Sequence, residues 1–274
     1  MRDVTLGQYY PSDSILHRLD ARVKFLGTLI YIVALFLVKG TLGYVFMTAV
    51  LLTLMVLTRV PFRIILGGLK PLTVILVVTV LFNLLLTPGD EIFRFGFISI
   101  TVQGVQVAVR MAIRLMYLVL GSSLMTLTTT PNQLTDGMEK LFAPLSRIHV
   151  PVHEIAMMMS IALRFIPILM EETDKIRQAQ IARGADFESG SFLRRLKAMI
   201  PLLVPLFVSA FRRANDLAMA MESRCYHGGD GRTQMKPLRY AARDYTAYAV
   251  LLVLLGISIF FRICGASLPG GKLI

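Results

Sequence analysis

Charged residues are scarce in this chain, and their scarcity excludes an ordinary water-soluble domain. Only 17% of the 274 residues are charged, against about 25% in an average soluble domain. Hydrophobic residues make up 55% of the chain, and the mean hydropathy is +0.66. The apolar residues also form long uncharged runs, which a soluble core would interrupt with solvent-facing charge. The sequence therefore predicts an all-α, polytopic membrane protein.

Several motifs that would indicate chemistry are missing. The two cysteines, Cys225 and Cys264, provide neither a disulfide framework nor a C-x-x-C metal-ligand pair. No G-x-x-x-x-G-K-[ST] phosphate-binding loop occurs, so energy from ATP would have to come through a partner. His149 and His153 stand close together, but Pro151 interrupts them and the H-E-x-x-H spacing is absent. We therefore expect no catalytic residue, no metal and no cofactor, with an intramembrane metal enzyme as a rival interpretation.

Positive charge exceeds negative charge, with 29 Lys and Arg against 17 Asp and Glu. Such an excess occurs in nucleic-acid-binding proteins, but basic residues beside apolar spans more often face the cytoplasm or anionic lipid. We therefore expect the lipid bilayer as a partner and no nucleic acid. Residues 1–24 are charged and contain no apolar run, so nothing there resembles a cleavable signal peptide.

About five transmembrane helices are predicted from charge-free runs and turn residues. Two short ones lie between Phe25 and Thr58, separated by the turn-like segment 39–43. The other three are expected at Pro71 to Gly89, Val102 to Thr128 and Tyr245 to Phe261. The aromatic segment 91–97 is too short to cross and is expected at the outer interface.

The placement of lysine and arginine predicts the orientation. With the amino terminus inside, nearly all Lys and Arg outside the spans face the cytoplasm; the exceptions are Lys39, Arg94, Arg262 and Lys272. Five spans then place the carboxyl terminus outside. We expect a multi-pass protein of the prokaryotic cytoplasmic membrane.

The fourth predicted span contains two arginines, Arg110 and Arg114, which share one helical face. One interpretation is that they snorkel to the outer interface or fill the bundle interior. The other is contact with a partner inside the membrane, because an unpaired charge there is costly.

A long insert separates the last two spans and is expected to carry function. We divide the chain into residues 1–130 with four spans, a cytoplasmic coupling module at 131–244, and residues 245–274 with the last span and tail. A short helix is expected from Pro131 through Leu141. Two long helices follow it.

The two long helices are predicted at about Val152 to Ala182 and about Phe192 to Ser223, because apolar residues recur there at steps of three and four. Each becomes charged toward its carboxyl end, which predicts a helix that begins against the membrane and ends in the cytoplasm. Pro167, Pro201 and Pro205 are expected to bend these helices. The apolar stripe of the second helix comprises Leu193, Leu196, Ile200, Leu203, Phe207, Ala210, Ala214, Leu217 and Met221.

Both helices end in an arginine between small residues. The two motifs are Ala182-Arg183-Gly184 and Ser223-Arg224-Cys225. One interpretation is structural, since a cation in the last helical turn contributes ~0.3–1 kcal/mol and glycine commonly follows a helix. The other is functional, because small neighbours let a partner approach the guanidinium, which can donate two hydrogen bonds to a carboxylate. The repetition favours a two-pronged docking site.

The sequence resembles the transmembrane (T) components of energy-coupling factor (ECF) transporters, the EcfT and CbiQ family. The resemblance rests on residues 180–184, on residues 213–224 and on the segment 20–24 before the first span. It covers nearly the whole chain.

This resemblance implies a non-catalytic subunit of an ATP-driven importer. Arg183 and Arg224 would end two crossing coupling helices and seat in two ABC-type ATPases, whose closure would tilt a substrate-binding S component for a vitamin or another micronutrient. Cys225 replaces the family's usual glycine, so the second helix is expected to be capped less tightly. The substrate stays open, as does the choice between several S components and one dedicated to cobalt or nickel. A self-contained permease is a rival interpretation, and it would need ionisable residues along several spans.

Overall fold

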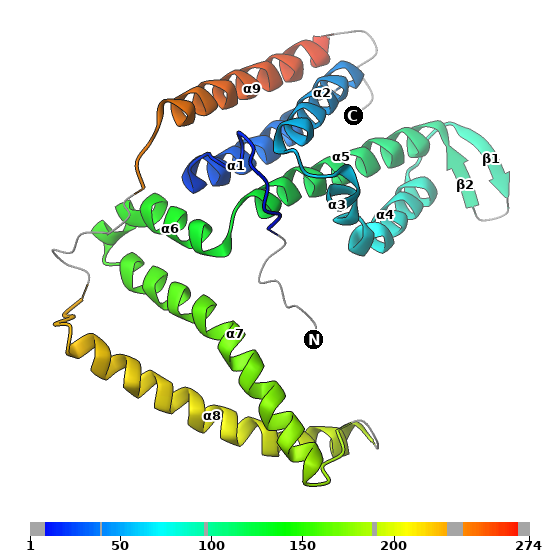
Figure 1. The fold of residues 1–274 in the computed structure, drawn as a ribbon. Helices are drawn as coiled ribbons and strands as arrows, with labels where there is room; N and C mark the ends of the chain where they lie inside the picture. Colours follow the sequence, from blue (N-terminus) through cyan, green and yellow to red (C-terminus); the bar gives the residue numbers. More distant parts are fainter. Residues whose placement is uncertain (1–8, 39, 96–97, 188–190, 229–237, 268–274) are drawn as a thin grey trace. The chain divides into compact units, whose positions relative to one another are not determined.

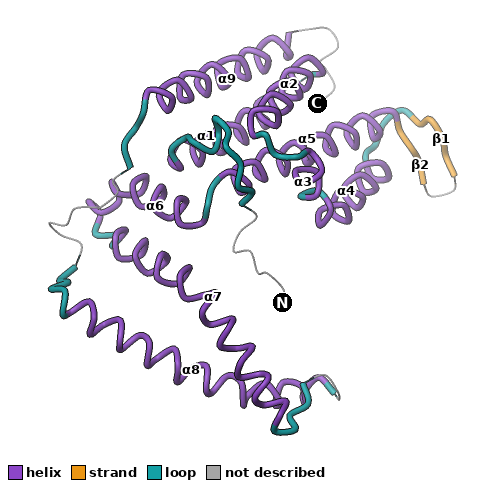
Figure 2. The backbone as a smooth tube through the Cα atoms, viewed as in Figure 1, coloured by secondary structure: helices purple, strands orange, loops and turns teal. Residues whose placement is uncertain are grey.

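The computed structural model describes residues 9–38, 40–95, 98–187, 191–228 and 238–267. They are mostly helical (Figure 2), which confirms the predicted class. In chain order (Figure 1) the elements are α1 (Ala21–Leu37), α2 (Thr41–Thr58), α3 (Phe62–Gly67), the 3₁₀ turn η1 (Lys70–Leu72), α4 (Thr73–Leu86), β1 (Glu91–Phe95), β2 (Ile98–Thr101), α5 (Val102–Thr128), α6 (Pro131–Phe142), the 3₁₀ turn η2 (Ala143–Ile148), α7 (Val152–Ala182), α8 (Phe192–Glu222) and α9 (Ala242–Ser267).

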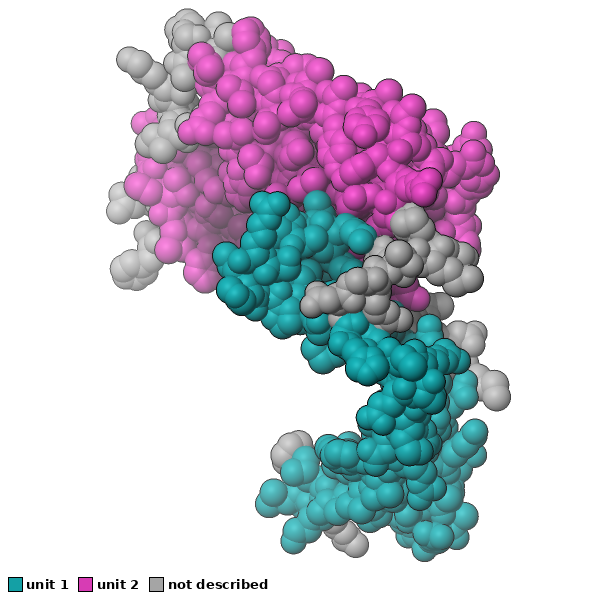
Figure 3. All heavy atoms as spheres, turned by 90° about the vertical axis from the view of Figure 1, so that its left-hand side faces the viewer, with its two compact units in different colours: residues 1–6, 138–237 teal, residues 7–137, 238–274 magenta. Residues whose placement is uncertain are grey.

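The chain divides into two compact units, coloured separately in Figure 3. We call residues 7–137 and 238–274 the bundle, and residues 138–237 the arm, whose unit also includes residues 1–6. The boundary falls within α6. The arm overlaps most of the segment 131–244, but the cytoplasmic location of that segment stays a prediction.

The core of the bundle lies where α1, α2 and α5 meet. α1 and α5 are antiparallel, since Lys24 Nζ donates to the Thr128 carbonyl at 2.8 Å and the Tyr31 hydroxyl donates to the Tyr117 carbonyl at 3.2 Å. Gly121 lets the two helices approach closely, because a Cβ atom there would lie 2.2 Å from a Tyr31 ring carbon. The buried core residues are Tyr31, Ala34, Leu35, Val38, Met47, Leu51, Met55, Val60, Ile65, Leu120, Leu124, Leu127 and Leu254.

The segment 20–24 anchors the start of α1. Asp20 is the N-cap residue, and its carboxylate accepts the Arg22 backbone N–H at 2.9 Å. The Asp20 backbone N–H donates to the buried Asp244 carboxylate of α9 at 3.0 Å. The Arg22 guanidinium lies 3.9 Å from the centre of the Tyr240 ring, a cation–π contact. In the sequence, residues 20–24 stood out only for their family resemblance. In the structure they link α1 to the start of α9.

The third apolar segment begins earlier than predicted. Its helical path starts with α3, and Phe62–Leu86 forms one candidate span of 25 residues, whereas the prediction began at Pro71. That proline lies inside η1, just before α4, where a missing backbone donor costs little. The helix ends at Leu86, because the residue before Pro88 is disfavoured in helical conformation.

Strands β1 and β2 form an antiparallel hairpin, in which Phe95 pairs with Ile98. The sequence predicted only a short non-crossing segment here, and its position at the outer interface stays a prediction. Thr101 joins the hairpin to α5, since its hydroxyl accepts the Gly104 N–H at 3.0 Å and donates to the Thr87 carbonyl at 2.9 Å. The hairpin therefore leads directly into a capped helix.

Five helices among the described residues are long and apolar enough to cross a membrane. They are Thr41–Thr58, Phe62–Leu86, Val102–Thr128, Val152–Ala182 and Ala242–Ile263. The number agrees with the prediction, but the set differs. α1 has 17 residues, the lower limit for crossing, whereas α7 meets the criterion although we expected it in the cytoplasm. Length and composition do not separate a crossing helix from one lying along the bilayer, because both carry an apolar surface.

Two span boundaries therefore need correction. The third candidate span starts at Phe62 and ends at Leu86, and the last candidate span is longer than Tyr245 to Phe261, because it runs from Ala242 to Ile263. The predicted span lies between the charges Arg243 and Arg262, but α9 continues through both of them. A helix can include charged residues where its end reaches water or a buried partner, as Asp244 does.

Candidate docking sites on the arm

The long helices α7 and α8 have their predicted bounds to within a residue and run antiparallel. Glu172 of α7 accepts hydrogen bonds from Ser209 Oγ and from Arg213 Nη2, the latter at 2.9 Å. Later in α7, Gln180 contacts Pro201, which lies earlier in α8. These contacts join later residues of α7 to earlier residues of α8. Figure 1 shows the two helices running in opposite directions.

The three prolines lie inside these helices, Pro167 in α7 and Pro201 and Pro205 in α8. Proline has no backbone N–H, so Pro205 leaves the Pro201 carbonyl without its helical donor. Gln180 Nε2 donates to that carbonyl at 3.4 Å. A side chain of α7 therefore satisfies a group that the α8 sequence leaves unpaired. The bends expected at the prolines stay a prediction.

α7 ends in a left-handed turn with Arg183 as its C-cap. Gly184 has a φ of +86°. Its N–H donates to the Ile181 carbonyl at 2.9 Å, and the Ala185 N–H donates to the Gln180 carbonyl at 3.0 Å. These two bonds form a Schellman motif, which satisfies carbonyls at the end of a helix.

α8 ends in the same backbone structure. Cys225 has a φ of +56°. Its N–H donates to the Glu222 carbonyl at 2.8 Å, and the Tyr226 N–H donates to the Met221 carbonyl at 3.0 Å. Arg224 therefore occupies the position of Arg183 in the first motif. The two similar sequence motifs therefore form the same helix-cap structure at the ends of α7 and α8.

The cysteine does not remove a hydrogen bond from the second cap, since both bonds have normal lengths. The difference from Gly184 is conformational, because the left-handed region costs a residue with a Cβ atom ~1–2 kcal/mol. Any weakening of the α8 cap would therefore come from backbone strain at Cys225. The weaker cap stays a prediction.

The six motif residues, Ala182, Arg183, Gly184, Ser223, Arg224 and Cys225, are all exposed. Within the described part of the chain, neither arginine takes part in an ion pair or a side-chain hydrogen bond. The Ser223 hydroxyl is used locally and donates to the Ala220 carbonyl at 3.0 Å. Each guanidinium therefore has its donors available for an acidic partner.

The antiparallel pairing separates the two arginines. Gln180, three residues before Arg183, contacts Pro201 near the start of α8, whereas Arg224 follows the end of that helix. At 1.5 Å per residue, about 35 Å of helix separates Pro201 from Arg224. The two arginines therefore lie far apart along the arm, and they are not adjacent prongs.

The first half of the predicted apolar stripe on α8 does not pack against α7. Leu193, Leu196, Ile200, Leu203 and Phe207 are each between 47% and 70% exposed. None of the described side chains of α8 is buried. A contiguous open apolar surface of this kind marks contact with a membrane or another protein.

The histidine region shows no gathering of metal ligands. His153 Nδ1 lies 2.9 Å from Glu139 Oε1, and His149 is the left-handed residue that ends η2. Within the described ranges, no three His, Cys, Asp or Glu side chains are grouped as a metal site requires.

The two arginines of α5 make different contacts. Arg110 Nε donates to the Gln106 carbonyl at 3.2 Å. The Arg114 guanidinium lies 5.6 Å from the centre of the Phe36 ring, and its buried Nε atom has no hydrogen-bond partner among the described residues. Both interpretations of these two arginines stay predictions.

The bundle and the arm together define a helical membrane protein with two arginine-ended helices. The family model CbiQ, described as a cobalt transport protein, matches residues 12–235. The chain is 52% identical to the energy-coupling factor transporter transmembrane protein EcfT of Clostridium kluyveri, over 96% of this chain and 98% of that relative. Proteins of the same name from Thermosediminibacter oceani and Bacillus subtilis are 49% and 46% identical, over 96% of this chain and 99% of each relative.

The chain therefore belongs to the family of CbiQ and EcfT transmembrane proteins, and the resemblance drawn from its motifs is confirmed.

Proposed function

We propose that this protein is the coupling subunit of an ECF-type importer in a prokaryotic cytoplasmic membrane. It carries the motion of two ABC-type ATPases to a membrane S component that binds a vitamin or another micronutrient. The chain itself is not catalytic, and its partners hydrolyse ATP. The family relationship supports the general role. The observation that carries the proposal is the repeated cap, which presents an exposed arginine at the end of each long helix.

Each arginine is the docking residue for one ATPase. A guanidinium can donate two parallel hydrogen bonds to a carboxylate, so the complementary surface is an acidic groove. The small neighbours of Arg183 and Arg224 leave room for such a groove to close around the helix end. The spacing of the two sites along α8 fits two ATPase subunits, because each subunit can bind one end without displacing the other.

The polar contacts of Glu172 join the two sites mechanically. Glu172 binds both Ser209 and Arg213 across the helix pair, so a displacement of one helix end is passed to the other helix. The exposed apolar stripe on α8 then supplies a surface for the S component or the bilayer. Motion at the arginines would reach the substrate-binding partner through this surface.

A T component dedicated to a cobalt or nickel importer is the second candidate, favoured by the match to a cobalt transport family. Neighbouring genes discriminate between the two. Genes for cassette ATPases alone favour a module shared by several S components, whereas adjacent cobalt or nickel transport genes favour a dedicated one. A self-contained permease has less support, since α2 and α4 contain no charged residue.

The docking role is tested by combining Arg183→Ala with Arg224→Ala in the assembled transporter. Truncating one partner of a buried, hydrogen-bonded charge pair costs ~2–5 kcal/mol. We expect the double variant to insert normally, to lose copurification of the ATPases and to lose substrate uptake.

The matched control combines Arg164→Ala with Arg212→Ala, which removes one exposed cation from the interior of each long helix. It should keep the ATPases and uptake. Full ATPase binding in the arginine-tip double variant would refute the docking role, as would labelling of Cys225 from the extracellular side of intact cells.

A further inference from the structure

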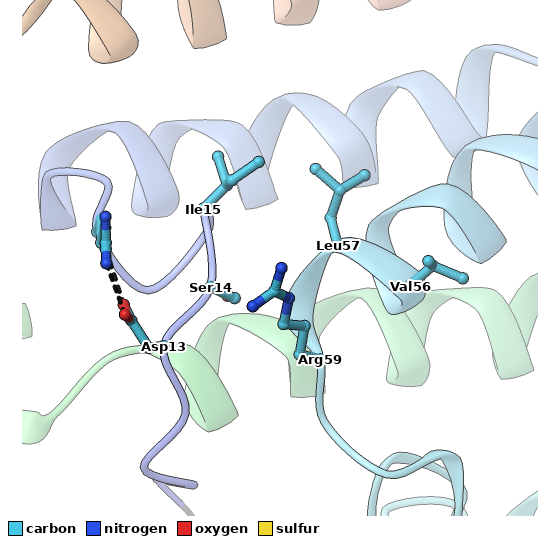
Figure 4. A pocket seen from close by; sticks show the side chains of 7 residues that line it. Asp13, Ser14, Ile15, Val56, Leu57 and Arg59 are labelled. Atoms are coloured by element: carbon cyan, nitrogen blue, oxygen red, sulfur yellow. Dashed lines mark hydrogen bonds and ion pairs between the residues drawn. The ribbon is translucent and has the colours of Figure 1, made fainter.

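A cavity lies in the bundle where the amino-terminal segment meets the end of α2 (Figure 4). Its volume is about 430 Å³, and it is lined by Asp13, Ser14, Ile15, Arg18, Val56, Leu57 and Arg59. The Ser12 hydroxyl donates to the Thr58 carbonyl at 3.0 Å and holds the two walls together. The cavity is therefore a formed feature of the bundle, separate from the docking sites of the arm.

Arg59 is the unusual residue of this cavity. It ends α2 with a φ of +53°, a conformation that Gly or Asn adopts at much lower cost. Its side chain reaches back toward Ser14 (Figure 4) and has no ion pair or hydrogen bond among the described residues. Strained backbone conformations often occur at functional sites, so the strained, charged Arg59 is a candidate for a functional role.

The opposite wall is electrically balanced. Arg18 donates to both carboxylate oxygens of Asp13, from Nε at 2.7 Å and from Nη2 at 2.5 Å. The hydrogen bond from Arg18, followed by its positive charge and by a smaller effect of the Arg59 charge, holds the pKa of Asp13 below its ordinary value, so this carboxylate is ionised at neutral pH. Asp13 and Arg18 neutralise each other, and Arg59 leaves the cavity with a net positive charge.

The position of Arg59 along the chain sets its depth in the membrane. No charged residue occurs from Thr41 to Thr58, and Arg59 is the first after this apolar helix. Basic residues at that position lie at the level of the lipid phosphates. Beside it, Ile15 and Val56 are 63% and 64% exposed. The cavity thus combines one available cation with apolar walls at the boundary between headgroups and acyl chains.

We propose that this cavity binds the phosphodiester headgroup of a membrane phospholipid. Arg59 donates to the phosphate oxygens, and Ile15 and Val56 contact the first carbons of an acyl chain. A free phosphate ion offers the same oxygens but leaves the apolar walls unused, so the lipid is the expected occupant. This site requires membrane insertion and does not depend on ATPase docking at Arg183 and Arg224.

The test uses the full-length chain in detergent, titrated with short-chain dihexanoyl phosphatidylglycerol and followed by native mass spectrometry. Parallel titrations use inorganic phosphate and dihexanoylglycerol, which lacks the phosphate. We expect the phospholipid to bind, and the other two probes not to bind at equal concentration. Arg59→Asn should weaken lipid binding about tenfold, because it removes a charge-assisted hydrogen bond.

Arg59→Asn is chosen because asparagine accepts the left-handed conformation, so the end of α2 keeps its fold. The matched control is Arg63→Asn, which removes the same charge from an exposed position of α3 that does not line the cavity. It should bind the lipid normally. Arg59→Lys keeps the charge without the forked donor, and it should bind more weakly than the native chain and more tightly than Arg59→Asn.

Three results would overturn the proposal. Native affinity in Arg59→Asn would exclude Arg59 as the headgroup ligand. Equal weakening in Arg63→Asn would show attraction to general surface charge. Equal binding of inorganic phosphate would show a free-anion site that makes no use of the apolar walls.

Discussion

The bundle and the arm are both helical, yet they are held together by different contacts. In the bundle, Leu35, Val38 and Met47 are completely inaccessible to solvent. In the arm, the only described residue of α7 that is buried is Ala156, and none of α8 is. The two arm helices are joined by polar contacts instead, and much of their apolar surface is open.

This difference separates a stable part from a responsive one. Elements with few buried contacts rearrange at low cost in free energy, whereas a packed core resists change. A bundle with its own core can keep its structure while the arm responds to partners. Substitutions in the bundle should therefore change stability, and substitutions in the arm should change coupling.

The largest expected effect on stability is at Gly121 in the bundle. In Gly121→Ala the new methyl group would overlap the Tyr31 ring, since its Cβ atom would lie 2.2 Å from a ring carbon. We expect a loss of about 1–3 kcal/mol from overpacking, measured as a lower unfolding temperature of the purified protein.

Gly256→Ala in α9 is the control, because nothing lies within 4 Å of its added Cβ atom. It should unfold at the native temperature or slightly above it. Equal unfolding temperatures for the Gly121 and Gly256 variants would contradict the close approach of α1 and α5.

In the arm, Glu172→Ala removes the acceptor of both Ser209 and Arg213. The Glu172 and Arg213 side chains are 22% and 40% exposed, so water screens their contact and it adds little to stability. We expect an unfolding temperature close to native, with uptake lowered about fivefold because the link between the two moving helices is lost.

The exchange Glu172→Arg with Arg213→Glu should recover part of this uptake, since it restores opposite charges at the same positions. Glu171→Ala changes an exposed neighbouring carboxylate and should leave uptake unchanged. A lower unfolding temperature with normal uptake in Glu172→Ala would assign the contact to stability instead of coupling.

The smallest effects are expected at the two caps. Gly184→Ala should destabilise the end of α7 by about 1 kcal/mol, and Cys225→Gly should stabilise the end of α8 by a similar amount. No atom lies within 4 Å of a Cβ added at Gly184, so the change reports backbone conformation alone. Hydrogen exchange at the Ala185 and Tyr226 amides measures both.

Gly184→Ala and Cys225→Gly are controls for each other. The two caps have equivalent hydrogen bonds, and one substitution removes a glycine where the other introduces one. Faster exchange at Ala185 and slower exchange at Tyr226 are expected. Unchanged exchange in both would mean that the left-handed conformation carries no strain at either helix end.

Local patterns predicted the long helices well. α5 and α7 have their predicted bounds, because charge-free runs and steps of three and four are properties of neighbouring residues. The third span was predicted to begin at Pro71 because the uncharged stretch begins after Lys70, whereas the helical path of the candidate span starts at Phe62 and includes that charge. The hairpin before α5 was missed as a hairpin because its strands are short.

The candidate site was only partly predictable. The repeat around Arg183 and Arg224 is visible in the chain, and so is the helical ending that contains it. The contact of Glu172 with Ser209 and Arg213 was not predicted, because it depends on the register between two helices. The sequence signal for this contact was weak, because Glu172 and Arg213 each stand beside a residue of the same charge and nothing in the chain indicates which of them pair.

The sequence by itself determined the membrane class, the long helices and the arginine that ends each of them, since hydropathy, periodicity and capping act over a few residues. Tertiary structure alone decided that the first half of the apolar stripe on α8 stays exposed, that Asp244 meets Asp20, and that Arg59 faces a cavity. Those features need residues far apart in the chain to be neighbours, and their register is set by packing against the rest of the fold.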